Sequence, residues 1–225
     1  TASGRLIVSD GVFSMEGSLA PVAELAELKE RYNALLMIDD AHGFWAVGEK
    51  GLGTASLFGV RDKVDIHYGT FSKELGSVGG FCAGRSEVID YLRYYARSAF
   101  FSSALPVSVA AAVLESIRVV REEPEHLANL KRNRDFFQHE LERRGFNTLN
   151  SRSAIIPVLI GDEAKLGQLQ MSLFAAGIFT NIGTTPAVNA SKCRLRLNVM
   201  ATHTTEQLAF AADKLEELGK KLEII

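Results

Sequence analysis

The chain has 225 residues, of which 47% are hydrophobic and 23% are charged, enough apolar material for one large domain or two modest ones. Its formal charge of −2, without a run of lysine or arginine, indicates neither a nucleic-acid partner nor an anionic membrane surface. The two cysteines, Cys82 and Cys193, lie far apart and outside any CxxC pattern, so the sequence favours a reducing cytoplasm over a disulfide framework or a zinc site.

The first half of the chain alternates strand-like and helix-like segments. It opens with Thr-Ala-Ser-Gly, without an initiator methionine or a signal peptide, and enters a strand at once, so we expect it to begin within a fold. The apolar run 34–38 stops abruptly at Asp39, which is typical of a strand that is buried on both faces of a parallel sheet. The predicted elements are strands at 5–9, 34–38, 64–68 and 81–84, with helices at 22–32 and 86–96.

The second half has the pattern of a small α+β unit. Its most apolar stretch, residues 105–114, is interrupted by Pro106, so no transmembrane segment is predicted. Predicted helices cover 106–121, 125–144, 163–176 and 204–221, and predicted strands cover 155–160, 179–182 and 194–199. We therefore predict an α/β fold, with a mostly parallel sheet in residues 1–110 and a small α+β domain in residues 111–225.

One lysine stands among small residues directly after a predicted strand, in Gly69-Thr-Phe-Ser-Lys-Glu-Leu-Gly-Ser-Val-Gly-Gly80. Such a lysine, Lys73, can form an imine if its surroundings lower its pKa. The glycines allow tight turns and a close approach of the backbone to a ligand. A lysine in a glycine-rich surface loop is the alternative that spacing alone leaves open. The segment is not a phosphate-binding Walker loop, because it lacks the Gly-Lys-Ser/Thr sequence.

Two carboxylates and a histidine follow another buried strand, in Met37-Ile-Asp-Asp-Ala-His-Gly43. Ligands gather at the carboxyl ends of strands in parallel sheets, and Asp39 is placed there. An acid/base pair, a metal site and a loop cap all fit this pattern. His67 and His203 are not arranged to complete a metal site, so no metal is predicted.

Two further segments carry polar side chains. Asp10-Gly-Val-Phe-Ser-Met-Glu-Gly17 contains a serine but no Gly-x-Ser-x-Gly elbow, which argues against a serine hydrolase. In Cys193-Arg-Leu-Arg-Leu-Asn198 the two arginines project to the same face of a strand. One of them is able to grip a carboxylate with two hydrogen bonds, and a solvated strand face is the alternative.

In this order and spacing, Asp10–Gly17, Asp39-Asp-Ala-His42, Gly69–Lys73 and Arg194-Leu-Arg196 together closely resemble the α-oxoamine synthase family of fold-type I pyridoxal-phosphate enzymes. The matching segments span almost the whole chain, and the combined match is specific, although the Asp…Lys part alone is shared by many fold-type I enzymes. The resemblance implies an aspartate-aminotransferase-like α/β fold and pyridoxal 5'-phosphate as the cofactor.

The resemblance also implies roles for individual residues. Lys73 would be the Schiff-base lysine and would later remove the α-proton of the substrate. Asp39 would pair with the pyridine nitrogen and keep the ring an electron sink. His42, helped by Ser14, would bind the phenolic oxygen of the ring, and Thr70 would contact the phosphate.

Two more roles follow from the same resemblance. Ser102 matches a position that reaches the phosphate across a dimer interface, so a homodimer is implied. Arg196, rather than Arg194, aligns with the arginine that binds the substrate carboxylate.

The family joins an amino acid to an acyl-CoA or acyl-carrier-protein thioester with loss of carbon dioxide. Within it, Gly69–Lys73 followed by Gly76–Phe81 looks most like bacterial serine palmitoyltransferases, with 8-amino-7-oxononanoate synthases close behind and glycine C-acetyltransferases less similar. Glu74 departs from the small residue that is common after the lysine, and Phe44-Trp45 departs from smaller residues and is a candidate for shaping the acyl site. Transamination and a non-catalytic subunit of a heterodimeric synthase are the competing interpretations.

The chain is much shorter at its N-terminus than members of the family. In them, the preceding half carries the aromatic or histidine side chain that stacks on the ring and a glycine-containing loop that holds the phosphate. We therefore expect this chain to be a C-terminal part, and we expect residues 1–225 alone to bind the cofactor poorly.

Overall fold

The computed structural model describes residues 4–225, and the chain divides into two compact units. The first unit consists of the described residues up to Phe13 together with Leu19–Pro124. The second consists of Ser14–Ser18 and Glu125–Ile225. A five-residue segment from the beginning of the chain therefore belongs with its C-terminal part.

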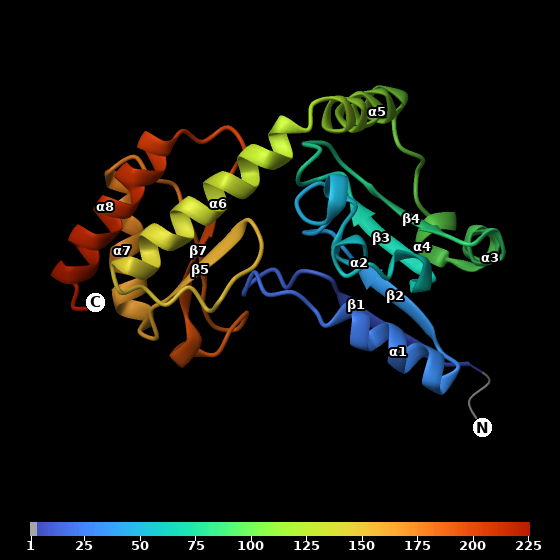
Figure 1. The fold of residues 1–225 in the computed structure, drawn as a ribbon, viewed down its shortest axis with the longest axis horizontal. Helices are drawn as coiled ribbons and strands as arrows, with labels where there is room; N and C mark the ends of the chain where they lie inside the picture. Colours follow the sequence, from blue (N-terminus) through green and yellow to red (C-terminus); the bar gives the residue numbers. More distant parts are fainter. Residues whose placement is uncertain (1–3) are drawn as a thin grey trace. The chain divides into compact units, whose positions relative to one another are not determined.

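A four-stranded sheet forms the centre of the first unit (Figure 1). Its strands are β1 (Leu6–Asp10), β2 (Leu35–Asp39), β3 (Ile66–Thr70) and β4 (Gly80–Gly84), which lie in that order. The first three strands run parallel and β4 runs antiparallel to β3. The predicted mostly parallel sheet is confirmed, and β4 is its antiparallel exception because it follows β3 after a short loop.

Helices and short turns connect the strands of the first unit. They are α1 (Val22–Tyr32), α2 (Thr54–Leu57), α3 (Ser86–Tyr95), α4 (Arg97–Phe100) and α5 (Val107–Glu122), with single 3₁₀ turns at Glu49–Gly51 and Arg61–Lys63. The predicted helix at 22–32 has the bounds of α1, and it ends where Asn33 adopts the left-handed conformation with φ of 48°. Sequence patterns did not indicate α2 and α4, because four residues are too few to show a helical period.

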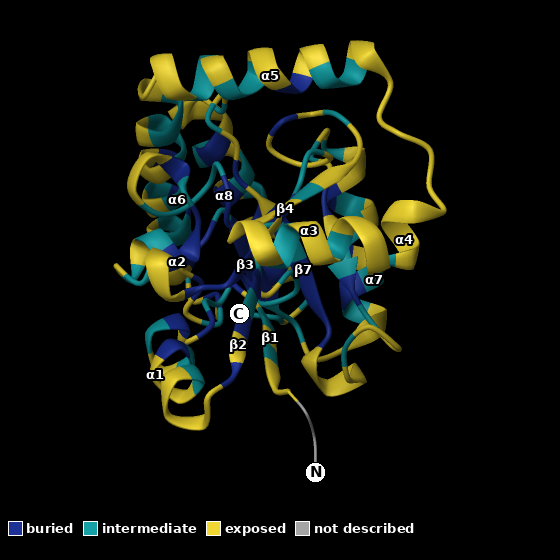
Figure 2. Cartoon of the chain, turned by 90° about the vertical axis from the view of Figure 1, so that its right-hand side faces the viewer, coloured by how far each residue is buried: buried dark blue, intermediate teal, exposed yellow. Residues whose placement is uncertain are grey.

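The core of the first unit is small. Its buried apolar side chains come from α1, β2, α2 and the segments beside them: Ala20, Val22, Ala26, Leu36, Ile38, Ala55 and Val64. Large apolar side chains are exposed elsewhere on this unit, including Leu6 and Val8 of β1 and Tyr94 of α3. Figure 2 shows that α3, α4 and α5 are coloured mostly as exposed or intermediate. This unit therefore carries apolar surface that its own residues leave uncovered.

The second unit contains a three-stranded antiparallel sheet of order β5-β7-β6. Its elements are α6 (Glu125–Arg143), β5 (Ile155–Leu159), α7 (Glu163–Ala175), β6 (Asn181–Gly183), a 3₁₀ turn at Ala190–Lys192, β7 (Arg194–Asn198) and α8 (Thr205–Lys221). Helix α6 packs against α8, and α7 contacts both α8 and β7 (Figure 1). None of the helices in residues 4–225 combines the length and the apolar character that crossing a bilayer requires.

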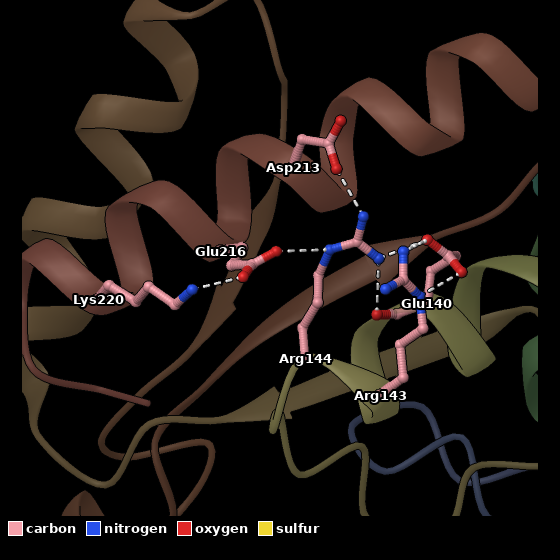
Figure 3. Close-up of polar contacts among 6 residues, drawn as sticks. All are labelled: Glu140, Arg143, Arg144, Asp213, Glu216 and Lys220. Atoms are coloured by element: carbon pink, nitrogen blue, oxygen red, sulfur yellow. Dashed lines mark hydrogen bonds and ion pairs between the residues drawn. The ribbon is translucent and has the colours of Figure 1, made fainter.

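The second unit has the larger core. Its fully buried side chains include Leu141 near the end of α6, Leu169 of α7, Leu195 of β7 and Leu215 of α8. At the surface between α6 and α8, the buried guanidinium of Arg144 binds carboxylates of both helices (Figure 3). Side chains from three helices and one sheet thus close around a single apolar interior.

Candidate active site

Charged side chains gather where the three parallel strands of the first unit end. Asp10 ends β1 and Asp39 ends β2, and the two residues are partners in the strand register. Asp39 is also the register partner of Tyr68 in β3, and the loop that carries Lys73 begins directly after this strand. Because the strands are parallel, all these side chains come to one edge of the sheet.

Asp39 is held in a turn that also contains His42. The Oδ1 atom of Asp39 accepts a hydrogen bond of 2.9 Å from the Ala41 N–H. This contact between a side chain and the backbone two residues on fixes the carboxylate and turns the chain back. Both Asp39 and His42 are half-buried, so neither side chain is removed from the edge of the sheet.

The loop after β3 is closed by its own hydrogen bonds. The hydroxyls of Thr70 and Ser72 lie 2.8 Å apart, and the Thr70 hydroxyl donates to the Gly79 carbonyl at 3.1 Å. The Phe71 N–H donates to the same carbonyl at 2.9 Å. Lys73 is exposed within this closed loop. Thr70 therefore has a clear local task in shaping the loop, beside the phosphate contact that the sequence predicts for it.

The charges at this edge influence one another. Burial and the neighbouring carboxylate of Asp39 raise the pKa of Asp10, and the ammonium of Lys73 opposes this rise. Asp10 is thus within electrostatic reach of both Asp39 and Lys73. The sequence analysis quoted Asp10 in a motif but assigned it no role. Its position as the last residue of an apolar strand, like that of Asp39, was the available signal.

Asp40 differs from its neighbour Asp39 in burial and in hydrogen-bond partners. Its side chain is only 1% exposed and accepts hydrogen bonds from Thr54, from the N–H at 2.8 Å and from the hydroxyl at 2.8 and 2.9 Å. Burial raises the pKa of Asp40 to about 6, against the effect of these hydrogen bonds. The two adjacent carboxylates are therefore not an acid/base pair, since Asp40 points into the fold.

Aromatic rings pack against one another around the end of β3. Phe44 is 7% exposed, and its ring centroid lies 5.2 Å from that of Phe81, which in turn stacks on Phe71 at 5.6 Å. A Cβ atom on Gly69 would lie 2.6 Å from the Phe81 ring, so glycine allows β3 to pass these rings closely. Trp45 has a φ of 67°, which is unusual for a bulky residue, and its buried Nε1 has no hydrogen-bond partner within residues 4–225.

The two arginines of β7 have different environments in the second unit. Arg194 is 3% exposed and forms an ion pair of 3.0 Å with Glu16. A solvated strand face is therefore wrong for this residue. Arg196 is half-buried, and its Nε donates to the Ser14 carbonyl at 2.6 Å. Burial lowers the pKa of the Arg196 guanidinium, which indicates that its charge is partly dehydrated.

Ser14 and Ser102 lie in different surroundings from the residues at the sheet edge. Ser14 belongs to the second unit, where its carbonyl accepts the bond from Arg196. Ser102 is exposed after α4, and its hydroxyl donates to the Ser98 carbonyl. Among residues 4–225, no group of three or more histidine, cysteine or acidic side chains is placed to hold a metal ion.

Comparison with known sequences gives this constellation a context. The sequence model of aminotransferase class I and II matches residues 2–215, which is nearly the whole chain. The chain belongs to the aminotransferase class I and II family. Among its relatives, an 8-amino-7-oxononanoate synthase of Thermosipho melanesiensis is 43% identical over 224 residues, covering all of this chain and 57% of that protein. A serine palmitoyltransferase of Sphingobacterium spiritivorum is 41% identical over 222 residues, covering 99% of this chain and 56% of that protein.

Solved structures agree with the family assignment. A serine palmitoyltransferase of Sphingomonas wittichii has a TM-score of 0.94 and 34% identity, with 99% of this chain and 56% of that chain covered. A serine palmitoyltransferase solved with pyridoxal phosphate as an internal aldimine has the same TM-score, 29% identity and the same coverage. These findings confirm the predicted fold-type I architecture and the resemblance to α-oxoamine synthases. This aminotransferase-family chain spans little more than half the length of the relatives it matches.

Proposed function

We propose that this protein is a pyridoxal-phosphate-dependent acyltransferase that condenses an amino acid with an acyl thioester and releases the thiol and carbon dioxide. The observation that carries the proposal is the grouping of Lys73, Asp39 and Asp10 at the carboxyl edge of the parallel sheet. It is supported by relatives that are named 8-amino-7-oxononanoate synthase and serine palmitoyltransferase.

The residues at the edge of the first unit fit pyridoxal phosphate. Asp39 supplies a fixed carboxylate for a protonated ring nitrogen, since Ala41 holds one of its oxygens. The hydroxyls of Thr70 and Ser72 are hydrogen-bond donors suited to phosphate oxygens. His42, in the same turn as Asp39, would donate to the phenolic oxygen. When bound, this cofactor withdraws electrons from the α-carbon of an amino acid.

The chain's own residues then bind, orient and move protons. The Nζ atom of Lys73 would attach the cofactor and, once released, accept the proton from the α-carbon of the amino acid. The carboxylate of Asp10 places negative charge near this amine. Arg196 would bind the substrate carboxylate, since an anion would stabilise a guanidinium that burial has partly dehydrated.

Substrates, assembly and location are also proposals. A serine palmitoyltransferase-like activity is proposed, with an amino acid and an acyl-CoA or acyl-carrier-protein thioester as substrates. A homodimer is proposed, in which Ser102 would reach the phosphate across the subunit interface, and Ser14 would help His42 to bind the phenolic oxygen. The exposed side chains of Phe100 and Phe101 beside Ser102 support it, because a subunit interface would cover such apolar surface. A cytoplasmic location is proposed from the absence of a disulfide pattern in the sequence.

The test is a covalent trap. The whole protein is incubated with pyridoxal phosphate, reduced with borohydride, digested and analysed by mass spectrometry. We expect the reduced cofactor on the peptide that contains Lys73, and we expect the Lys73→Ala variant to lose it. Lys63→Ala is the matched control, because Lys63 is an exposed lysine before β3 that pairs with Glu30 at the surface. Label on Lys63, or undiminished label in the Lys73 variant, contradicts the proposal.

The reaction is identified by its products. L-serine, glycine and L-alanine are tested in turn with acyl thioesters of long, medium and short chain length, and the products and the release of thiol and carbon dioxide are measured. Serine with a palmitoyl thioester supports the serine palmitoyltransferase assignment, and formation of 8-amino-7-oxononanoate supports the 8-amino-7-oxononanoate synthase alternative. An aminated cofactor without thiol release indicates a transaminase. Cofactor binding at Lys73 without any turnover indicates a non-catalytic subunit.

A further inference from the structure

Hydrogen bonds hold both the buried carboxylate of Asp40 and the backbone of the same residue. Its side chain accepts hydrogen bonds from the N–H and the hydroxyl of Thr54, and a further one from the Ala55 N–H. Its own N–H donates to the Tyr68 carbonyl of β3 at 2.9 Å. Its carbonyl accepts from the Gly43 N–H at 2.8 Å. Asp40 thereby joins β3, the turn that contains His42 and the beginning of α2.

Three glycines press their backbones against this carboxylate. A Cβ atom would lie 2.0 Å from an Asp40 carboxylate oxygen if built on Gly11, 2.1 Å on Gly43 and 2.4 Å on Gly53. No side chain tolerates such distances, so these positions require glycine for the approach. Gly11 directly follows Asp10, and Gly43 directly follows His42. The segments that carry the candidate site residues thus pack on one buried side chain.

We propose that Asp40 is a positioning residue for the cofactor site. Its hydrogen bonds with Thr54 hold it in place, and it thereby fixes the positions of Asp10, Asp39 and His42. The inference rests on the proposed function, because it assigns Asp40 to the same site. Asp40 would not touch the cofactor. It would act through the backbone, since it follows Asp39 directly and the Gly11 N–H donates to the Asp39 carbonyl at 2.7 Å.

The chemistry of the contact supports a positioning role. Three donors converge on the two oxygens of Asp40, a demand that a carboxylate meets and an amide does not, since an amide turns one acceptor into a donor. An apolar side chain would leave the buried Thr54 N–H and hydroxyl without acceptors. Burying a carboxylate here disfavours its charged form, so filling space alone does not explain the residue.

The test compares cofactor affinity with overall stability in the whole protein. Asp40→Asn weakens the bonds from Thr54 and Ala55, and Thr54→Val removes one donor while keeping its shape. Thr54→Ser keeps both donors of residue 54 and is the conservative variant. Asp65→Asn is the matched control, because Asp65 is 5% exposed and accepts the Leu36 N–H at 2.8 Å at the amino end of β3, the opposite edge of the sheet.

We expect Asp40→Asn and Thr54→Val to raise the dissociation constant of pyridoxal phosphate by roughly tenfold, the effect of disrupting one buried hydrogen bond. Thr54→Ser and Asp65→Asn should stay within roughly twofold of the unchanged protein, even though Asp65→Asn lowers the melting temperature. In the cofactor-free protein, hydrogen exchange should become faster at Gly43 and Phe44 in Asp40→Asn and not in Asp65→Asn, because both N–H groups donate to the Asp40 carbonyl.

The outcomes separate this inference from the proposed function. If the unchanged protein binds the cofactor at Lys73 and Asp40→Asn binds it equally well, the positioning role is wrong and the function stands. If Asp65→Asn weakens binding as much as Asp40→Asn, the effect is general loss of structure, and the inference is wrong again. If the unchanged protein takes no cofactor at Lys73, both are overturned.

Discussion

At the scale of single residues, neighbouring positions with the same side chain have opposite environments. Asp39 is half-buried at the sheet edge, and Asp40 is buried against Thr54. Arg196 and Arg194 differ in the same way, because Glu16 pairs with Arg194 from 178 residues away. The sequence analysis placed Asp39 at the end of a strand and both arginines within one strand, as the structure does. Residue type and spacing could not tell the members of each pair apart, because the deciding partners are distant in the chain, and only the family resemblance distinguished them.

The raised pKa of Asp40 predicts a stability that depends on pH. Burial raises the pKa of the Asp40 carboxyl from its ordinary value of 3.8 in the unfolded chain to about 6 in the fold. Between these values the folded state binds more protons, so the free energy of unfolding falls by up to about 3 kcal/mol as the pH rises. Urea unfolding at several pH values should show this fall, and Asp40→Asn should lack it. Asp10, whose pKa is also raised, contributes equally to the pH dependence of both proteins, so its contribution cancels when the two are compared. Parallel curves for the two proteins would contradict the prediction.

Arg144 is predicted to stabilise the second unit. Its side chain is 5% exposed and binds Glu140, Asp213 at 2.5 Å and Glu216 at 3.0 Å (Figure 3). Arg144→Met should lower the free energy of unfolding by about 2 kcal/mol, because it leaves the partly buried carboxylates around residue 144 without the cation that they bind. Arg143→Met is the control and should lower it less, because Arg143 is 50% exposed and also pairs with Glu140. Equal losses in urea unfolding would show that burial of the guanidinium does not matter.

At the scale of elements, hydrophobic periodicity predicted the long helices and most strands, and the ends of these elements depended on local chemistry. Helix α8 begins with a capping box, in which Thr204 accepts the Gln207 N–H at 3.2 Å and Gln207 accepts the Thr204 N–H at 3.0 Å. The sequence analysis gave no direction for the strand at 81–84, and β4 is antiparallel because the loop after β3 is too short for a parallel crossover.

The capping box predicts the effect of a conservative change. Thr204→Ala should lower the stability of the second unit by about 1 kcal/mol, because the Gln207 N–H at the start of α8 loses the Thr204 hydroxyl as its acceptor. Thr205→Ala is the control, since Thr205 is the first residue of α8 and not its cap. Thermal unfolding of both variants distinguishes them. A control as destabilised as Thr204→Ala would contradict the role of the cap.

At the scale of the whole molecule, two separate cores share one chain. The core of the second unit contains only residues from Glu125 onward, and that of the first unit contains only residues before it. The arginines of β7 and the edge with Lys73 thus belong to different compact units.

Separate cores predict separate losses of stability. Leu36→Ala in β2 and Leu195→Ala in β7 each remove a side chain that is 0% exposed. Each should cost about 3 kcal/mol in its own unit, from lost burial and the cavity left behind. Hydrogen exchange followed by mass spectrometry should show faster exchange in the first unit for Leu36→Ala and in the second for Leu195→Ala. Faster exchange throughout the chain in either variant would show that the units unfold together.

The sequence by itself determined the alternation of strands and helices, the placement of Asp39 and Lys73 after strands, and the family. These features depend on neighbours within a few residues or on motif spacing, so they are present in the linear order. The tertiary structure alone decided that Asp40 is buried, that Asp10 joins the charged edge, and that Ser14–Ser18 belongs with the second unit. Each of these depends on a contact between segments far apart in the chain, and burial and charge interactions exist only once folding has brought them together.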